Sequence, residues 1–264
     1  MESTATLSTI DRAEEFLLEG ESQQALDLVR TLYGQTLTST DRGRSLALEV
    51  ACLGQLGRDD EANKLIVDVM KEEGDDFPFV LAAGIEFSDL GENTHAEVFL
   101  RNLCEIEPNN PVAWFNLAIA LGRIERYEEA AQAYAKCIAC DMNFSEAYVQ
   151  RAYCLEMTDD LDGAVAMYHA YLERVPDDSE GWKSLGIAES DRKRFEDAYA
   201  AFRKALEHTD EAEDVYFNWA ITAVRAGDEV ELDRCLTKLQ DLDPEGWRTL
   251  LTRADYEEAE GHIW

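Results

Sequence analysis

A pattern of small and large side chains repeats every 34 residues along most of this chain. The repeats start at Gly43, Phe77, Pro111, Ser145, Ser179 and Glu213. A unit of this length holds two helices, which cannot bury their apolar faces alone but form a continuous core when they stack on neighbouring units. The period therefore predicts an all-α fold, a solenoid of helix-turn-helix repeats.

Small and large residues occupy different fixed places of the unit. The eighth place reads Val50, Gly84, Ala118, Ala152, Gly186 and Ala220, and the twentieth reads Ala62, Ala96, Ala130, Ala164, Ala198 and Leu232. Large side chains stand at the fourth place (Leu46, Val80, Trp114, Tyr148, Trp182, Tyr216) and the twenty-fourth (Ile66, Leu100, Tyr134, Tyr168, Phe202, Leu236). The large residues give each helix an apolar stripe, and the small ones let paired helices cross closely.

Prolines and glycines punctuate the units. The thirty-second place carries Pro108, Pro176 and Pro244. Each is expected to end a second helix, because proline has no amide hydrogen and clashes with the preceding turn. Gly57, Gly91 and Gly227 are expected in the turns between paired helices, where positive backbone angles are often required.

This arrangement resembles the tetratricopeptide repeat family. The family's 34-residue unit has a bulky residue, a leucine-glycine or leucine-alanine pair, an alanine, an aromatic residue and a terminal proline. The unit from Pro111 matches at Trp114, Leu117, Ala118, Ala130 and Tyr134, and the unit from Ser179 matches at Trp182, Leu185, Gly186, Ala198 and Phe202. The resemblance implies a right-handed superhelix of about seven repeats; it is specific for fold and says little about function.

We expect one array over residues 1–264. Its repeats are predicted at 43–76, 77–110, 111–144, 145–178, 179–212 and 213–246, after a degenerate unit at about 6–39 that is out of step by three residues. The slip indicates that Thr38 to Asp41 form a longer connection and cap the next helix. A charged helix at about 247–260 is expected to cap the array, because an end repeat must bury one face against its neighbour and expose the other to solvent.

The chain is strongly acidic, with 56 acidic and 24 basic residues and a net charge of −32. A polyanion would be repelled, and no basic and aromatic stripe is visible, so nucleic acid is excluded as a ligand class. The acidity either keeps the protein soluble, including in a salty cytoplasm, or attracts a basic partner. Its spread through all units favours the first interpretation.

No stretch approaches the roughly 18 apolar residues that cross a bilayer, and residues 1–15 lack the features of an export signal. We therefore expect a cytoplasmic protein without membrane insertion. The cysteines are expected to be reduced, mostly buried helix residues rather than a disulfide framework. They are Cys52, Cys104, Cys137, Cys140, Cys154 and Cys235.

No pattern indicates a catalytic, metal or cofactor site. Cys137 and Cys140 have a zinc-like spacing, but two further ligands of suitable type are not evident nearby, and Cys137 falls on a packing place of its helix. The four histidines, His95, His169, His208 and His262, lie far apart in different units. A glycine-rich phosphate loop and a nucleophile elbow are both absent from the sequence. We expect a non-catalytic protein without a cofactor.

The resemblance implies that the first helix of each unit lines an inner groove with its fifth, sixth and ninth places, among others. The partner-binding residues implied in this way are Phe115, Asn116, Ile119, Val149, Gln150, Tyr153, Lys183, Ser184, Phe217, Asn218 and Ile221. Asn and Gln carry both a donor and an acceptor, so the sixth place can pair with the backbone of an extended peptide. The alternatives are that the polar groups are only hydrated and that the apolar ones pack within the array.

The leading interpretation is an adaptor or scaffold that binds a peptide segment or a protein in this groove. One alternative is a scaffold that assembles into homo-oligomers, and another is a chaperone for a basic client protein. The carboxylate clamp by which some family members hold chaperone tails is not assembled, because Leu81 and Ile85 stand where lysine and asparagine belong.

Overall fold

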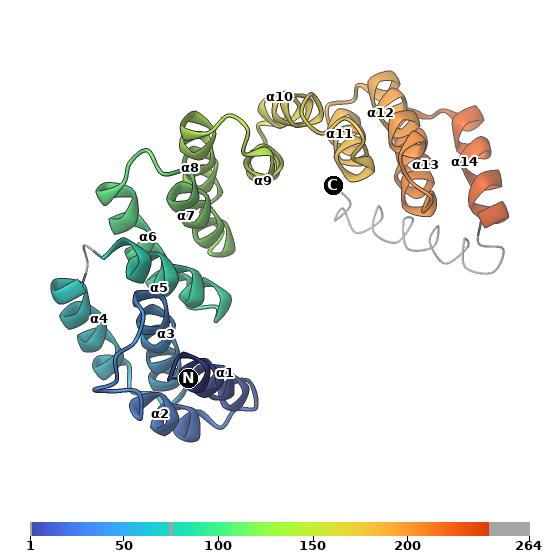
Figure 1. Ribbon diagram of the computed structural model, residues 1–264. Coiled ribbons are helices and arrows are strands. Elements are labelled where there is room, and N and C mark those ends of the chain that lie inside the picture. Colours follow the sequence, from blue (N-terminus) through green and yellow to red (C-terminus); the bar gives the residue numbers. More distant parts are fainter. Residues whose placement is uncertain (1, 74–75, 243–264) are drawn as a thin grey trace. The chain divides into compact units, whose positions relative to one another are not determined.

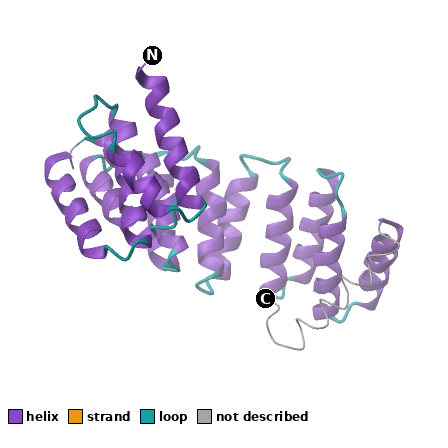
Figure 2. Ribbon diagram, turned by 90° about the horizontal axis from the view of Figure 1, so that it is seen from below, coloured by secondary structure: helices purple, strands orange, loops and turns teal. Residues whose placement is uncertain are grey.

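The computed structural model describes residues 2–73 and 76–242, and within them every regular element is a helix (Figure 2). The chain divides into two compact units, residues 1–142 and 143–264. The first contains α1 (Glu2–Leu18), α2 (Ser22–Arg30), α3 (Ser39–Gln55), α4 (Asp59–Glu73), α5 (Phe77–Asp89), α6 (Asn93–Ile106), α7 (Pro111–Arg123) and α8 (Tyr127–Cys140) (Figure 1). The second contains α9 (Ser145–Glu156), α10 (Leu161–Leu172), α11 (Ser179–Asp191), α12 (Phe195–Glu207), α13 (Glu213–Ala226) and α14 (Glu229–Leu242). The all-α prediction is confirmed, and the capping helix predicted at about 247–260 lies outside the described residues.

Short polar side chains fix where the first helices begin. Thr38 accepts a hydrogen bond from the backbone N–H of Asp41 at 3.1 Å, so the predicted cap of α3 is confirmed. Asp76 and Asp178 cap α5 and α11 in the same way, which satisfies backbone donors that have no partner inside the helix. The predicted position of the longer connection is wrong: α3 already begins at Ser39, and the connection is residues 31–38. Thr38 ends that connection instead of starting it.

A left-handed residue lies in the turn of each helix pair. Gly57, Gly91 and Gly227 have φ of 67°, 82° and 68°, as their sequence positions indicated. The α1–α2 pair has Gly20 in its turn, with φ of 79°, and the three remaining pairs have non-glycine residues at the same place: Glu125, Asp159 and Lys193, with φ of 62°, 63° and 60°. The turn geometry is therefore kept even where the side chain makes it costly.

The helices of a pair cross where the eighth-place residue meets the twenty-fourth. A Cβ atom on Gly84 would lie 2.7 Å from Leu100, and one on Gly186 would lie 2.6 Å from Phe202. Both large side chains are fully buried. The small eighth-place residues therefore lie at the crossing, as the sequence pattern indicated, and their contact partners are the large residues of the twenty-fourth place.

Tryptophan at the fourth place ties a first helix to the preceding turn. The indole N–H of Trp114 donates to the carbonyl oxygen of Pro108 at 2.8 Å, and that of Trp182 donates to Pro176 at 2.8 Å. Each proline follows the end of a second helix, α6 or α10. Because the partner lies only six residues earlier, this bond orients the chain where one repeat passes into the next.

The first unit contains an irregular contact. α3 packs more extensively against α5 than against its own partner α4 (Figure 1). The close approach depends on Gly43, because a Cβ atom there would lie 2.6 Å from the carbonyl oxygen of Phe79 and 2.7 Å from the backbone nitrogen of Ala83. α4 is consequently held by α3 alone among its major contacts, and buries only Ala62 and Ile66.

The Gly43→Ala variant tests this helix crossing. We expect it to lower the free energy of unfolding by about 1–3 kcal/mol, because backbone atoms must move to admit the methyl group. Gly122→Ala is the matched control: that helical glycine has nothing within 4 Å of its Cβ position, so alanine should raise stability by about 0.5–1 kcal/mol. Chemical unfolding measures both, and equal effects of the two changes would contradict the close approach.

The turn geometry gives a second prediction. Lys193→Gly should raise the free energy of unfolding by about 0.5–1 kcal/mol, because glycine adopts the left-handed conformation without a Cβ clash. Lys204→Gly, on an exposed position inside α12, should lower it by about 1 kcal/mol. Opposite signs for these two lysine substitutions in denaturant unfolding are the expected result.

Candidate functional site

On α7, the three predicted partner-binding residues are all half-buried. The ring of Phe115 makes an edge contact with Tyr134 on α8, with ring centroids 5.6 Å apart. The side-chain amide of Asn116 donates to the carbonyl oxygen of Val112, one turn earlier, at 2.8 Å. Ile119 lies one turn further along the helix. The first unit therefore offers part of an aromatic ring and an oriented amide on one helix face.

On α9, exposure rises towards the end of the helix. Val149 packs against the core of the second unit, whereas Gln150 is exposed. Tyr153 is 47% exposed, and Met157, one turn beyond it, is 49% exposed. Met157 was not in the predicted set, although its spacing of four residues from Tyr153 could have suggested it. These side chains provide the accessible apolar surface of this helix.

On α11, Lys183 is paired instead of being available as an isolated cation. Its ammonium group lies 2.8 Å from a carboxylate oxygen of Glu180 and 3.9 Å from one of Asp214 on α13, and its side chain is only 14% exposed. Ser184 is half-buried beside it. The contact to Asp214 shows that the first helices α11 and α13 lie side by side here.

On α13, Asn218 repeats the geometry seen on α7. Its amide donates to the carbonyl oxygen of Asp214, one turn earlier, at 2.7 Å. Phe217 is half-buried, whereas Ile221 is only 8% exposed and contributes to packing. Because a primary amide has two N–H groups and an oxygen, Asn218 keeps a donor and an acceptor for a ligand after making this bond.

A cleft of about 800 Å³ lies in the second unit, near the turns of its helix pairs. Met157, Leu161, Ile187 and Phe195 form its apolar walls, and an ion pair of 2.6 Å between Asp191 and Arg225 contributes polar groups. Sequence analysis missed this cleft, because its lining comes from the ends of helices and from turns, where the repeat pattern carries little information.

Glu156 lines the same cleft as a half-buried carboxyl group. Burial raises the pKa of Glu156 to about 7, and the negative charge of Asp191 adds to the effect. The hydroxyl of Tyr168 lies 3.3 Å from its carboxylate and opposes the shift. Protonation of Glu156 is therefore coupled to the packing of α9 against α10.

The cysteines are unpaired thiols, and all but Cys140 are buried. Burial raises the pKa of Cys137 to about 12 and that of Cys154 to about 11, which makes these two thiols unreactive packing groups. Among the described residues, no three His, Cys, Asp or Glu side chains gather as metal ligands would. None of the described helices is long and apolar enough to cross a membrane.

Comparisons with known proteins agree with the helical repeat fold. Two family models, both described as tetratricopeptide repeat, match residues 99–132 and 145–188. Among solved structures, YrrB, titled a TPR protein with an unusual peptide-binding site, superposes with a TM-score of 0.60 at 17% identity, covering 72% of this chain and 97% of YrrB. MamA superposes with a TM-score of 0.51 at 21% identity, covering 60% of this chain and 93% of that one.

Two curated proteins are similar over part of their length. The tetratricopeptide repeat-containing protein trd-1 of Caenorhabditis elegans is 22% identical over 189 residues, which are 61% of this chain and 24% of that protein. The human protein O-mannosyl-transferase TMTC3 is 30% identical over 170 residues, 60% of this chain and 18% of that protein. The chain thus spans a quarter or less of these relatives.

The fold is an all-α repeat solenoid. Residues 99–132 and 145–188 match tetratricopeptide repeats, and the superposition on YrrB shows the same fold, so the matches support a tetratricopeptide repeat protein. Such repeats support a protein–protein interaction scaffold, and proteins built from them are typically non-catalytic.

The raised pKa of Glu156 predicts how stability depends on pH. The folded pKa of Glu156, about 7, lies above its ordinary value of 4.5, so its contribution to stability is present below about pH 4.5 and is lost as the pH rises through 7. Glu156→Gln should therefore be more stable than the natural protein at pH 8 and should lose less stability between pH 4.5 and 7. Thermal unfolding across this range measures the difference, and the exposed Glu173→Gln control should keep the original slope.

Proposed function

We propose that the first helices of each unit bind extended peptide segments of a partner protein, with Asn116 in the first unit and Asn218 in the second each holding peptide backbone. The observation that carries the proposal is their shared geometry. Each amide is oriented by a bond to the carbonyl oxygen one turn earlier, at 2.8 and 2.7 Å. Because the side chain is already fixed, less conformational entropy is lost when a peptide binds.

The remaining donor and acceptor on each amide match the chemistry of a peptide backbone. One peptide group offers an N–H and a C=O whatever its side chain is, so this type of contact gives affinity without demanding one sequence. Gln150, exposed on α9, supplies the same pair of groups from the sixth place of its helix. Ser184 adds a hydroxyl at the sixth place of α11.

Apolar contacts are assigned to the more accessible part of the predicted set. Tyr153 is 47% exposed, and Phe115, Ile119 and Phe217 are half-buried. Val149 and Ile221 act mainly by packing, which keeps these helices in place. Lys183, held between two carboxylates, positions α11 against α13 and is a weaker candidate for direct contact.

The similarity to YrrB supports the proposal at the level of fold, because a protein of this architecture carries a peptide-binding site according to its title. The function assigned to this chain is accordingly that of a non-catalytic adaptor located in the cytoplasm. Self-assembly and the holding of a basic client are tested as competing outcomes.

The experiment compares partner capture by the natural protein and by the Asn116→Ala/Asn218→Ala variant. A partner recovered with the natural protein is identified and its binding segment is then titrated against both forms. Loss of two hydrogen bonds should weaken binding by about 1–3 kcal/mol, which is about 5- to 150-fold. Asn63→Ala, on the exposed side of α4, is the matched control and should bind normally.

Unchanged binding by the double variant, with unchanged thermal unfolding, would refute the role of the two amides. Light scattering over a range of concentration tests self-assembly, because a homo-oligomer dissociates on dilution. Salt titration tests the basic client, whose affinity would fall steeply with ionic strength, whereas backbone and apolar contacts depend weakly on salt.

A further inference from the structure

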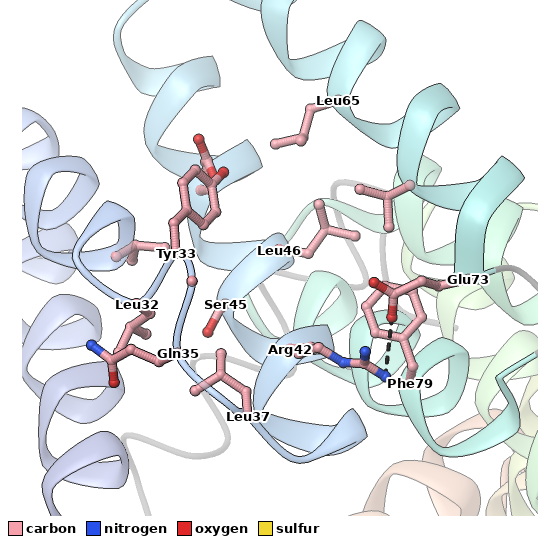
Figure 3. Close-up of a pocket in the computed structure, with 14 residues that line it drawn as sticks. Leu32, Tyr33, Gln35, Leu37, Arg42, Ser45, Leu46, Leu65, Glu73 and Phe79 are labelled. Atoms are coloured by element: carbon pink, nitrogen blue, oxygen red, sulfur yellow. Dashed lines mark hydrogen bonds and ion pairs between the residues drawn. The ribbon is translucent and has the colours of Figure 1, made fainter.

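The first unit contains a cavity of about 310 Å³ between α2, α3 and α4 (Figure 3). Most of its walls are apolar: Val29, Leu32, Leu37, Leu46, Leu65 and Phe79. Residues of the connection 31–38, including Tyr33, form one side. Pockets that hold small ligands or anchoring side chains occupy about 300–1,000 Å³ and are lined in this way, so this cavity is large enough for one bulky apolar group.

The cavity follows from two irregularities of the repeat pattern. α3 and α5 meet directly at Gly43, which leaves α4 packed on α3 through Ala62 and Ile66. Leu65 and Val69 of α4 remain half-buried and line the cavity. The longer connection before α3 supplies the opposite wall, so the space lies where the first unit departs from the regular register.

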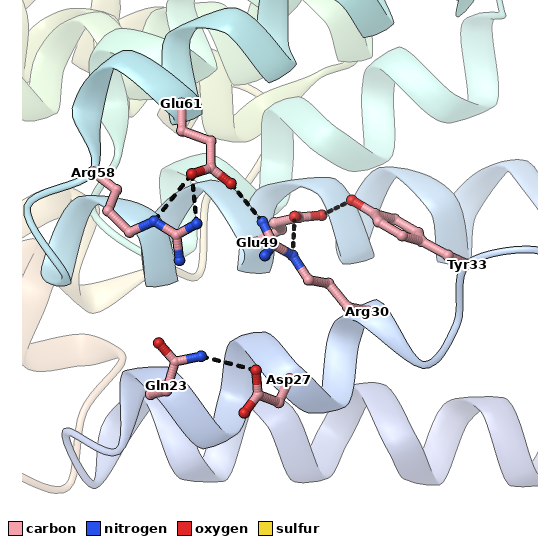
Figure 4. Close-up of polar contacts among 7 residues, drawn as sticks. All are labelled: Gln23, Asp27, Arg30, Tyr33, Glu49, Arg58 and Glu61. Carbon is pink, nitrogen blue, oxygen red and sulfur yellow. Dashed lines mark hydrogen bonds and ion pairs between the residues drawn. The ribbon is translucent and has the colours of Figure 1, made fainter.

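A network of charged groups fixes the walls on one side. Glu49, only 3% exposed, accepts a hydrogen bond from the guanidinium group of Arg30 at 2.8 Å and another from the hydroxyl of Tyr33 (Figure 4). Arg30 also binds Glu61 on α4 at 2.7 Å. Because Arg30, Glu49 and Glu61 belong to α2, α3 and α4, this network holds the three helices around the cavity.

The other side contains an incompletely bonded carboxylate. Oε2 of Glu73 lies 3.1 Å from Nη2 of Arg42, yet it has no hydrogen bond of acceptable geometry. The same guanidinium nitrogen lies 2.8 Å from Asp76, which takes the well-formed bond. Glu73 and Asp76 thus share one guanidinium group, which leaves a negative charge beside the cavity, so Glu73 favours a ligand that brings a cationic N–H group.

We propose that this cavity is a second binding site, which takes one large apolar side chain of a basic peptide segment and pairs Glu73 with a neighbouring lysine or arginine of that segment. The site is separate from the sixth-place amides. It rests on the proposed function in one respect, that the occupant is a peptide.

Charge complementarity selects the occupant. Arg30 neutralises Glu49, but Arg42 is the one cation for both Glu73 and Asp76, and the chain as a whole carries −32. An anionic amphiphile is repelled by this field, whereas a cation next to an apolar group is attracted. The volume of the cavity admits only one large side chain of the peptide, whereas a peptide bound as a helix would present several.

The test uses three defined peptides, acetyl-Gly-Phe-Lys-Gly-amide, the same peptide with glutamate for lysine, and the same peptide with alanine for phenylalanine. Their binding to the full chain is followed by amide chemical shifts in NMR titrations. The Phe-Lys peptide should bind at the cavity, and the peptides with either replacement should bind more weakly. Equal binding of the Phe-Glu and Phe-Lys peptides would overturn the proposal.

Two variants locate the site. Val69→Trp fills the cavity from α4. It should weaken binding of the Phe-Lys peptide by at least about tenfold, because one buried apolar anchor is lost. Its control, Val67→Trp, places the same ring on the exposed side of α4, where valine is 52% exposed. Glu73→Gln should weaken binding about threefold, as a partly exposed charge pair does, whereas Glu72→Gln next to it should change little.

The Asn116→Ala/Asn218→Ala variant separates the two proposals. If that variant binds the Phe-Lys peptide normally and Val69→Trp loses this binding, the cavity is supported as a binding site, whether or not the sixth-place amides bind a partner. Loss in the double asparagine variant with normal binding in Val69→Trp overturns it. Equal binding of 2-phenylethylamine, with the same sensitivity to Val69→Trp, would replace the peptide by a small cationic ligand and also overturn it.

Discussion

The fold of this chain depends on the contact between a small residue on one helix and a large residue on its partner. Gly186 admits the ring of Phe202, and Gly84 admits Leu100, at distances that even one added carbon atom would prevent. A helix pair that crosses this closely buries its large side chains completely. The exposed faces of the first helices are then free to carry polar residues, because the core does not need them.

The fold could be predicted from the repeat pattern, because the small residue of the eighth place and the large residue of the twenty-fourth both recur every 34 residues. It could not anticipate the turn conformation of Lys193, because nothing in a lysine indicates a left-handed backbone. Positive φ was expected only at glycines such as Gly57, yet the turn imposes the same geometry on both. Tertiary packing outweighs the local preference of one residue there.

The residues of the candidate site could be predicted from the sequence, but their hydrogen bonds and exposure could not. The sixth place identified Asn116 and Asn218, but the bond of each amide to its own helix became visible only with coordinates. Ile221 was expected to present apolar surface, but it is only 8% exposed. The cavity beside α4 was missed altogether, because it arises from displacement of a helix and not from any residue type.

Electrostatics connect the stability of the array to what it can bind. Glu49 and Glu189 are buried carboxylates that arginines hold, Arg30 in one case and Arg192 in the other, and such charges are tolerated only when they are paired. With 24 basic against 56 acidic residues, the chain has many more carboxylates than cations to pair with them. Glu73 shares the guanidinium group of Arg42 with Asp76 and so favours a further cation, and the apolar cavity beside Glu73 makes this attraction specific to a cation that is attached to a bulky apolar group.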